Sequence, residues 1–300
     1  MSSLNASLQK TRKSAAVYPR INPRHIIETV LPHVVLLSYT ALALFPIFLT
    51  IINSFKERKN IFKSPYSLPF GDLFTTQGYA TVFDPRRASA GLYLQNSLIV
   101  SIGTIIIVLL AGSMAAHALA EYKFPGTRLM GLYMAIGIMI PIRLGTVSLI
   151  KLCTSLGLTG TLQGLILIYT AQNLPLAVFI LQQFMSELPG ELKDAARVDG
   201  ASEYRIFWRL VLPLVRPALA SVAVFALIPT WNDLWFPLIM ASRDETRTVT
   251  LGVQMFTGQF LSDWTALLAA LTLAMIPVLV LYALFSKQLI RGLTAGAIKS

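Results

Sequence analysis

Ten of the chain's charged residues lie in one polar segment, residues 187–217, between two long apolar stretches. Five are acidic and five are basic: Glu187, Glu191, Lys193, Asp194, Arg197, Asp199, Glu203, Arg205, Arg209 and Arg216. Charges of both signs beside a helix can fix its register in a groove on another protein. Ala195 and Ala196 are small enough to let such a helix seat deeply. The chemistry that this segment favours is therefore docking to a partner, although an ordinary solvated amphipathic loop is the alternative.

The same segment has the signals of two short helices separated by Gly200. Glu191 and Asp194 come early, where negative charge favours the positive end of the helix dipole, and Arg197 comes late. Gly200 can adopt a left-handed conformation and end the first helix. Ser202 can cap the start of the second.

Residues for enzymatic chemistry are missing from the sequence. No glycine is followed by lysine, so there is no Walker A phosphate loop. Cys153 is the single cysteine, which excludes an intramolecular disulfide and indicates a packing residue. The three histidines, His25, His33 and His117, are interpreted as interfacial or packed side chains. We therefore expect no catalytic residue, no metal site and no cofactor bound by this chain.

The composition is that of a membrane protein. Of the 300 residues, 55% are hydrophobic and 13% are charged, and the mean hydropathy is +0.64. Soluble domains carry about 25% charged residues. The net charge of +11 would suggest nucleic acid in a soluble chain. In a membrane chain it instead indicates Lys and Arg in cytoplasmic segments that face anionic lipid.

Six apolar stretches are long enough to cross a bilayer as helices, which requires about 20 residues. They are residues 34–54, 95–120, 129–150, 162–185, 217–240 and 264–286. Five of them contain a proline: Pro46, Pro141, Pro175, Pro229 and Pro277. Freed backbone groups at such kinks must be satisfied by neighbouring helices or water.

Basic residues predict the orientation, because an even number of spans puts both termini on one side. With the termini inside, the cytoplasmic segments hold 15 Lys and Arg and the outer loops hold 9. This excess favours cytoplasmic termini. Residues 187–216 are then cytoplasmic, and residues 1–32 form a basic cytoplasmic arm without the features of a cleavable signal peptide.

A few polar side chains are expected at membrane depth: Arg143, Gln172, Asn173, Asn232 and Asp233. Such groups usually face a bundle interior or a translocation pathway. The alternative is that they form hydrogen bonds between helices.

The polar segment resembles the cytoplasmic coupling loop of ABC-importer permeases. That loop has Glu-Ala-Ala, three residues, Gly, nine residues and Ile-x-Leu-Pro. Here Asp194-Ala195-Ala196 precedes Gly200, and Leu210-Val211-Leu212-Pro213 follows. Asp194 replaces Glu and Leu210 replaces Ile. The resemblance implies that an ATP-hydrolysing subunit is coupled through Asp194, Ala195, Ala196, Asp199, Gly200, Leu212 and Pro213.

The tail, residues 292–300, is similar to the end of maltose-type sugar permeases, Gly-Leu-Thr-Ala-Gly-x-Val-Lys-Gly, with departures at Ile298 and Ser300. Residues 79–83, 96–100 and 231–238 also look like that group. The resemblance covers roughly residues 30–300. It implies an all-α membrane protein with six transmembrane helices and the type I ABC importer permease fold, in a bacterial inner membrane.

The same resemblance implies the partners. They are a homologous second permease, a dimer of ATPase subunits that uses ATP and Mg, an extracytoplasmic sugar-binding protein and membrane lipid, with no nucleic acid. Residues 241–263 would reach the binding protein, and residues 291–300 would reach the ATPase. The expected organisation is an arm (1–32), a first transmembrane helix and outer loop (33–94), a five-helix core (95–290) and a cytoplasmic tail (291–300).

The cargo is predicted to be a sugar or a sugar derivative. Arg143 could complement an anionic sugar; the favoured interpretation is that it pairs with Asp233 or the partner subunit, or extends to the outer surface. Rival functions are a permease for a polyamine, phosphonate or peptide, an ion-coupled secondary transporter, and a structural scaffold.

Overall fold

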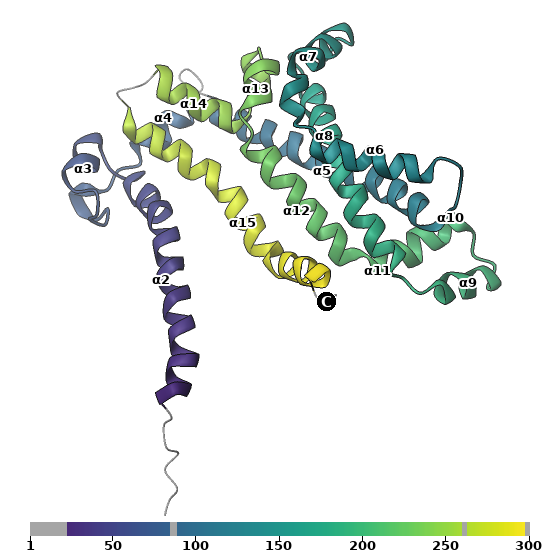
Figure 1. The fold of residues 1–300 in the computed structure, drawn as a ribbon. Coiled ribbons are helices and arrows are strands. Elements are labelled where there is room, and N and C mark those ends of the chain that lie inside the picture. Colours follow the sequence, from purple (N-terminus) through teal and green to yellow (C-terminus); the bar gives the residue numbers. More distant parts are fainter. Residues whose placement is uncertain (1–22, 85–88, 260–262, 298–300) are drawn as a thin grey trace, which may run out of the picture. The chain divides into compact units, whose positions relative to one another are not determined.

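The computed structural model describes residues 23–84, 89–259 and 263–297, with side chains from residue 30 onward except residues 255–259, 281 and 284–297. Within these ranges the chain is helical and has no strand (Figure 1). The α-helices are α2 (Pro23–Asn53), α3 (Arg58–Lys63), α4 (Gln77–Val82), α5 (Ala90–Glu121), α6 (Thr127–Met139), α7 (Thr146–Ser155), α8 (Leu162–Ser186), α9 (Gly190–Val198), α10 (Glu203–Ile206), α11 (Leu212–Leu214), α12 (Arg216–Asn232), α13 (Trp235–Met240), α14 (Val249–Gln259) and α15 (Trp264–Ala297). Short 3-10 turns cover Gly71–Leu73 (η2), Ile142–Gly145 (η3) and Asp244–Thr246 (η5), and Phe207–Val211 (η4) forms a π-helical turn.

The chain divides into two units, Met1–Leu49 and Thr50–Ser300. In the first unit, the described residues form most of α2. This helix begins at Pro23, a residue that suits the first turn of a helix, so the end of the predicted arm is helical rather than disordered. Residues 1–22 of the arm lie outside the described residues.

The second unit is built around α5, α8 and α12, which pack against one another, with α15 against α12. Their shared core includes Val108, Ala177, Leu181 and Val222, each at most 2% exposed. Gly112 on α5 allows close approach, because a Cβ atom there would lie 3.2 Å from the Cβ of Ala177 on α8. Small residues at helix contacts are the usual way for membrane helices to pack tightly.

Two of the predicted spans are broken. Between α6 and α7 the chain bends by 88° at Pro141, which has no N–H for helix continuation. Helix α12 ends at Asn232, and Asp233 has an extended backbone before α13 begins. By contrast, α8, α12 and α15 continue through Pro175, Pro229 and Pro277.

Three helices in the described residues are long and apolar enough to cross a membrane, or up to five if each bent pair counts as one span. The three are Val30–Asn53, Ala90–Glu121 and Leu162–Ser186, and Trp264–Val280 is a shorter apolar helix. They match the first, second, fourth and sixth predicted stretches in position. The count of six spans stays a prediction, because the third stretch is bent at Pro141 and the fifth is interrupted between α12 and α13.

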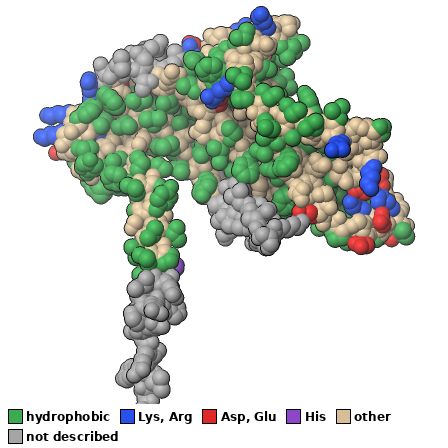
Figure 2. Space-filling model, viewed as in Figure 1, with side chains coloured by type: hydrophobic (Ala, Val, Ile, Leu, Met, Phe, Trp, Pro, Cys, Tyr) green, Lys and Arg blue, Asp and Glu red, His purple; other side chains and the backbone are tan. Residues whose placement is uncertain are grey.

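The surface of the second unit is mainly apolar (Figure 2). Exposed side chains include Ile102 and Ile106 on α5, Leu132 on α6 and Leu167 on α8, each at least half exposed. Acidic and basic side chains gather together at the end of the unit formed by α9 and α10, and Lys and Arg also project near α3 and α7. This distribution fits helices surrounded by lipid with polar ends in water.

Candidate functional site

The polar segment folds as predicted, into two short helices around Gly200. Helix α9 has Glu191 in its first turn and Arg197 in its last. Gly200 has a φ of 78°, in the left-handed region that favours glycine. The Ser202 side chain caps α10 by accepting a hydrogen bond from the backbone N–H of Arg205 at 3.4 Å. Local turn chemistry therefore sets the shape of this segment.

The predicted coupling residues do not share one environment. Asp194, Ala195, Asp199 and Gly200 are exposed, and the Asp194 side chain is 72% exposed. Ala196 is half-buried and packs against the helical core. Helix α9 thus turns Ala195 outward and anchors Ala196 inward, as consecutive residues on a helix must point in different directions.

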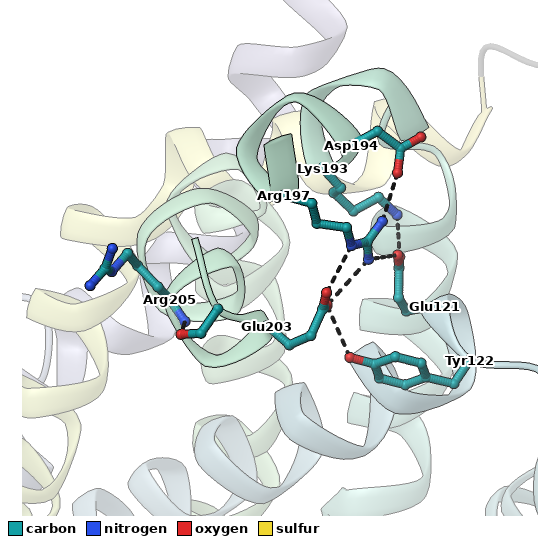
Figure 3. Close-up of polar contacts among 8 residues, drawn as sticks. Glu121, Tyr122, Lys193, Asp194, Arg197, Glu203 and Arg205 are labelled. Carbon is teal, nitrogen blue, oxygen red and sulfur yellow. Dashed lines mark hydrogen bonds and ion pairs between the residues drawn. The ribbon is translucent and has the colours of Figure 1, made fainter. Parts of the chain in front are cut away.

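Arg197 is the centre of an ion-pair network that we call the Arg197 clamp: Glu121, Lys193, Asp194, Arg197 and Glu203 (Figure 3). Its guanidinium donates hydrogen bonds at 2.7 Å to one carboxylate oxygen each of Asp194, Glu121 and Glu203. A further bond of 3.2 Å reaches the second oxygen of Glu203. These bonds raise the pKa of Arg197 above its ordinary value, with the bond to Glu203 as the largest cause. One side chain therefore joins α9, α10 and the end of α5.

Lys193 and Tyr122 complete the attachment to α5. Lys193 Nζ forms an ion pair with Glu121, whose side chain is only 11% exposed. Tyr122, directly after α5, donates its hydroxyl hydrogen to Glu203 Oε2 at 3.1 Å. Burial and this bond raise the pKa of the Tyr122 hydroxyl. Charge-assisted bonds of this kind are stronger than neutral ones and hold α9 in a fixed place.

Leu212 and Pro213 lie at the end of the polar segment, where it joins the helical core. Leu212 is half-buried and packs against the same core cluster as Val211. The π-helical turn at Phe207–Val211 comes immediately before α11, in which Pro213 cannot donate a backbone hydrogen bond. These two residues position the loop within the core, whereas the outer surface of α9 is available to a partner.

Of the residues in the Arg197 clamp, only Asp194 is among the predicted coupling residues. Lys193, Arg197 and Glu203 belong to the polar segment but were not assigned to the site, and Glu121 and Tyr122 lie outside that segment. The sequence did contain a signal for Glu121 as a functional residue, because it is the first charged residue after a run without charges from residue 88 to residue 120. Its pairing with α9 depends on the packing of distant segments, which the spacing alone does not give. His117, one turn earlier on α5, packs on Phe207 and Tyr122, in line with its interpretation as a packed side chain.

The residues predicted at membrane depth fall into two groups. Arg143 on η3 and Asp233 between α12 and α13 form an ion pair, with 3.3 Å between Nη2 and Oδ1. Asp233 Oδ2 also accepts hydrogen bonds from the Tyr169 hydroxyl at 2.9 Å and from the backbone N–H of Phe236 at 3.0 Å. The pairing that the sequence favoured for Arg143 is therefore present, and Tyr169 is a further participant.

The amides behave differently from one another. Asn173 is buried and donates to the Tyr169 carbonyl at 2.8 Å and to Thr230 Oγ1 on α12 at 3.5 Å, as expected for a bond between helices. Gln172 is half-buried on the same turn of α8. Asn232 is exposed, and its amide donates to the Ile228 carbonyl one turn earlier. Asn173 thus acts in helix packing.

The predicted contact regions are described only in part. Residues 241–263 form η5 and α14, but residues 260–262 lie outside the described residues. Helix α15 continues through Ala297, so the backbone of the tail from residue 291 is helical that far. The tail's side chains and residues 298–300 are not described.

Comparison with known proteins gives the family. Residues 108–295 match the family described as "Binding-protein-dependent transport system inner membrane component". The diacetylchitobiose uptake system permease protein NgcG of Streptomyces coelicolor is 33% identical over 269 residues, which cover 89% of this chain and 88% of that protein. The arabinooligosaccharides transport system permease protein AraQ of Halalkalibacterium halodurans is 32% identical, over 86% and 92% of the two chains.

A solved structure confirms the predicted all-α permease fold. A chain of a bacterial ABC transporter involved in the import of the acidic polysaccharide alginate superposes with a TM-score of 0.72 at 20% identity, covering 90% of this chain and 99% of that chain. Its similarity shows the fold alone. Together with the apolar helices, the family match makes this chain a multi-pass protein of the inner membrane. The chain belongs to the family of binding-protein-dependent transport system inner membrane components.

Proposed function

We propose that this chain is the membrane-spanning permease subunit of an ATP-driven importer that carries a sugar or sugar derivative across the inner membrane. Two similar proteins are named as permeases for diacetylchitobiose and for arabinooligosaccharides. The Gly-Leu-Thr-Ala-Gly sequence at residues 292–296, which resembles maltose-type permeases, supports the same cargo class. A permease for a polyamine, phosphonate or peptide is the alternative, and an ion-coupled transporter is a weaker one.

The Arg197 clamp is the observation that carries this proposal. It fixes α9 to α10 and to the end of α5 through four hydrogen bonds and ion pairs on Arg197 and Lys193. Ala195 and Asp194 remain exposed on the outer side of α9. A partner that grips α9 would therefore move α5 with it, which is the mechanical requirement for coupling ATP hydrolysis to a change in the helix bundle.

The proposed assembly follows from this coupling. A dimer of ATPase subunits, which binds ATP and Mg, docks on α9, and this chain has no ATPase site or cofactor of its own. A homologous second permease completes the pathway, and an extracytoplasmic binding protein delivers the sugar. Both termini and residues 187–217 then face the cytoplasm, in agreement with the excess of Lys and Arg in those segments.

Uptake by cells that lack this gene tests the proposal. A panel of labelled neutral and anionic oligosaccharides is offered to the deletion strain and to strains that carry the parent gene or a variant. We expect uptake of one sugar to be lost and to return with the parent gene and with Ala195→Ser, but not with Ala195→Trp. Unchanged uptake across the panel, together with lost uptake of a polyamine, phosphonate or peptide, would support the alternative cargo.

A further inference from the structure

A second polar cluster lies where the two helix breaks meet, away from α9 and α10. We call it the Arg143 cluster: Arg143, Thr146, Tyr169, Asp233 and Trp235. Arg143 comes from the break between α6 and α7, and Asp233 from the break between α12 and α13. Irregular backbone at membrane depth persists where protein covers it or where it lines a water-filled space. Broken helices are also a common source of substrate sites in transporters.

The position of Tyr169 gives the depth of the cluster. At 1.5 Å per residue, Tyr169 lies about 10 Å from the start of α8 and about 25 Å from its end, where the coupling loop begins. The Arg143 side chain is nevertheless 65% exposed. A charged group so exposed at this depth is costly in lipid, so its surroundings must be water, a polar solute or another protein.

The cluster is electrically balanced before any ligand binds. The Asp233 side chain is 10% exposed, and both of its oxygens are occupied: Oδ1 by Arg143, and Oδ2 by the Tyr169 hydroxyl and the Phe236 N–H. Three residues of the chain therefore donate to this carboxylate. Because its negative charge offsets that of the guanidinium, the cluster does not need an anionic ligand to complete it.

The exposed side of the cluster offers hydrogen-bond donors beside an aromatic ring. A guanidinium has five N–H donors, and among the described residues Arg143 uses one of them, toward Asp233. Its central carbon lies 5.9 Å from the centre of the Trp235 ring, and Trp235 is 41% exposed. Thr146 orients the Trp235 ring by accepting from its indole N–H at 3.1 Å, and it donates to the backbone carbonyl of Arg143 at 2.6 Å. The guanidinium itself is held by Asp233.

This combination suits one class of solute. A neutral sugar has C–H faces that lie on aromatic rings and hydroxyl groups that bond to planar polar side chains. For a uronate or a phosphorylated sugar, the attraction of the Arg143 guanidinium would be offset by the Asp233 carboxylate beside it. We propose that the Arg143 cluster is a contact site for a neutral saccharide, with Trp235 supplying the aromatic face and Arg143 the donors. This inference rests on the proposed function and names the charge class of its cargo.

The exposed fractions argue against a purely structural pair. A pair that only locks two helix breaks together gains from burying both partners and their neighbours. Here Asp233 is buried, whereas Arg143 and Trp235 are 65% and 41% exposed. Thr146 holds the Trp235 ring, and Asp233 holds the Arg143 guanidinium. Rigid support with an open polar and aromatic face is the arrangement expected of a binding site.

Photoaffinity labelling of the complete transporter in membrane vesicles, without the binding protein, tests the charge preference. The first probe is the neutral oligosaccharide identified by uptake, carrying a diazirine. The second is the same probe with its terminal hydroxymethyl group oxidised to a carboxylate. Asp233→Asn keeps the side-chain shape but removes the charge that offsets Arg143. Asp244→Asn is the matched control, because Asp244 forms an exposed pair with Arg247 at 2.7 Å.

We expect the parent transporter to label with the neutral probe in preference to the oxidised one, on residues 142–147 or 233–236. Asp233→Asn should shift the labelling ratio toward the oxidised probe by about tenfold, and Asp244→Asn should leave it unchanged. An unchanged ratio in Asp233→Asn, or labels only elsewhere in the chain, would overturn the inference.

Uptake at saturating sugar tests the aromatic contact, since the binding protein is then fully loaded in every strain. Trp235→Ala should lower the rate about tenfold, and Trp235→Phe, which keeps an aromatic face, by less than about threefold. Equal loss in both variants, or loss of the second permease from the purified Trp235→Ala complex, would show a structural or interface role instead. Normal rates in both variants would also overturn the inference.

The failure of this inference is distinct from failure of the proposed function. If the gene is required for uptake of an anionic sugar alone, the proposed function stands and the neutral-saccharide site is wrong. If the gene is required for the uptake of no sugar, the proposed function and the neutral-saccharide site are both wrong.

Discussion

The Arg197 clamp and the Arg143 cluster each place an arginine against carboxylates, but they are built for different tasks. Arg197 makes three bonds of 2.7 Å to carboxylates from three segments, and its side chain is 35% exposed. Arg143 makes one bond of 3.3 Å to one carboxylate, and its side chain is 65% exposed. The first arginine uses four of its five N–H donors within its own chain, whereas the second uses one.

This difference shows how one helix pair can serve two ends of a transporter. Helix α5 carries Glu121 of the clamp, and α8 carries Tyr169 of the Arg143 cluster. The two helices pack closely along their length. In the proposed assembly, the ion-pair network at one end would transmit force, and the open cluster at the other end would contact a solute.

Gly112→Leu should have the largest effect, because it separates the helix pair that both regions share. Its new side chain would press on Ala177, whose Cβ lies 3.2 Å from the position of a Cβ at residue 112. Overpacking of this kind costs about 1–3 kcal/mol. Thermal unfolding of the purified complex and sugar uptake should both fall. Gly131→Leu on α6 is the control, since a Cβ there meets nothing within 4 Å.

Arg197→Ala should break the clamp alone. The change leaves Glu121, Asp194 and Glu203 without their shared partner, so α9 can move without α5. We expect transport per ATP hydrolysed, measured in proteoliposomes, to fall about tenfold. Arg205→Ala removes the same charge from α10, where no side-chain bond to Arg205 is present among the described residues, and should retain coupling. An equal loss of transport per ATP in Arg197→Ala and Arg205→Ala would contradict the coupling role of the Arg197 clamp.

Arg143→Gln should lower stability less than Gly112→Leu. It leaves the buried Asp233 carboxylate with the donors from Tyr169 and Phe236 only. Because Arg143 is 65% exposed, solvent screens the pair and the loss should be about 1 kcal/mol or less. Thermal unfolding measures this. A larger loss than in Gly112→Leu would mean that the pair mainly holds the helix breaks together.

Glu121→Gln should have the smallest effect and would sharpen the comparison. The amide oxygen can still accept from Arg197 or Lys193, but the charge of the carboxylate is gone. We expect transport per ATP to fall about twofold, since the amide offers one acceptor oxygen in place of two and carries no negative charge. A loss as large as that of Arg197→Ala would mean that Glu121, rather than Arg197, is the centre of the clamp.

The shape of the polar segment, residues 187–217, was predictable because its determinants are local. Gly200 and Ser202 act within a few residues, and the structure places them as their chemistry requires. The apolar stretches also predicted the positions of α5 and α8. Proline was a poor guide to helix breaks, because Pro141 ends a helix whereas Pro175 and Pro229 do not. In a membrane helix, neighbouring helices and side chains can satisfy the groups that proline frees.

The partners of the charged residues were harder to predict. The pairing of Arg143 with Asp233 was expected, but the roles of Tyr169 and Trp235 were not, because both look like ordinary apolar residues in the sequence. Glu121 meets Arg197 across 76 residues of chain. Contacts of this kind arise from helix packing, for which a single sequence gives no direct signal.

Crosslinking from α9 tests the central claim most directly. A cysteine at Ala195, in a Cys153→Ser chain so that it is the single thiol, is coupled to a photoactivatable maleimide in native membranes. A cysteine at Lys151, an exposed residue of α7, is the control. The account predicts that illumination captures the ATPase subunit from Ala195→Cys and not from Lys151→Cys. Capture from Lys151→Cys alone, or no capture from Ala195→Cys in an actively transporting complex, would contradict it.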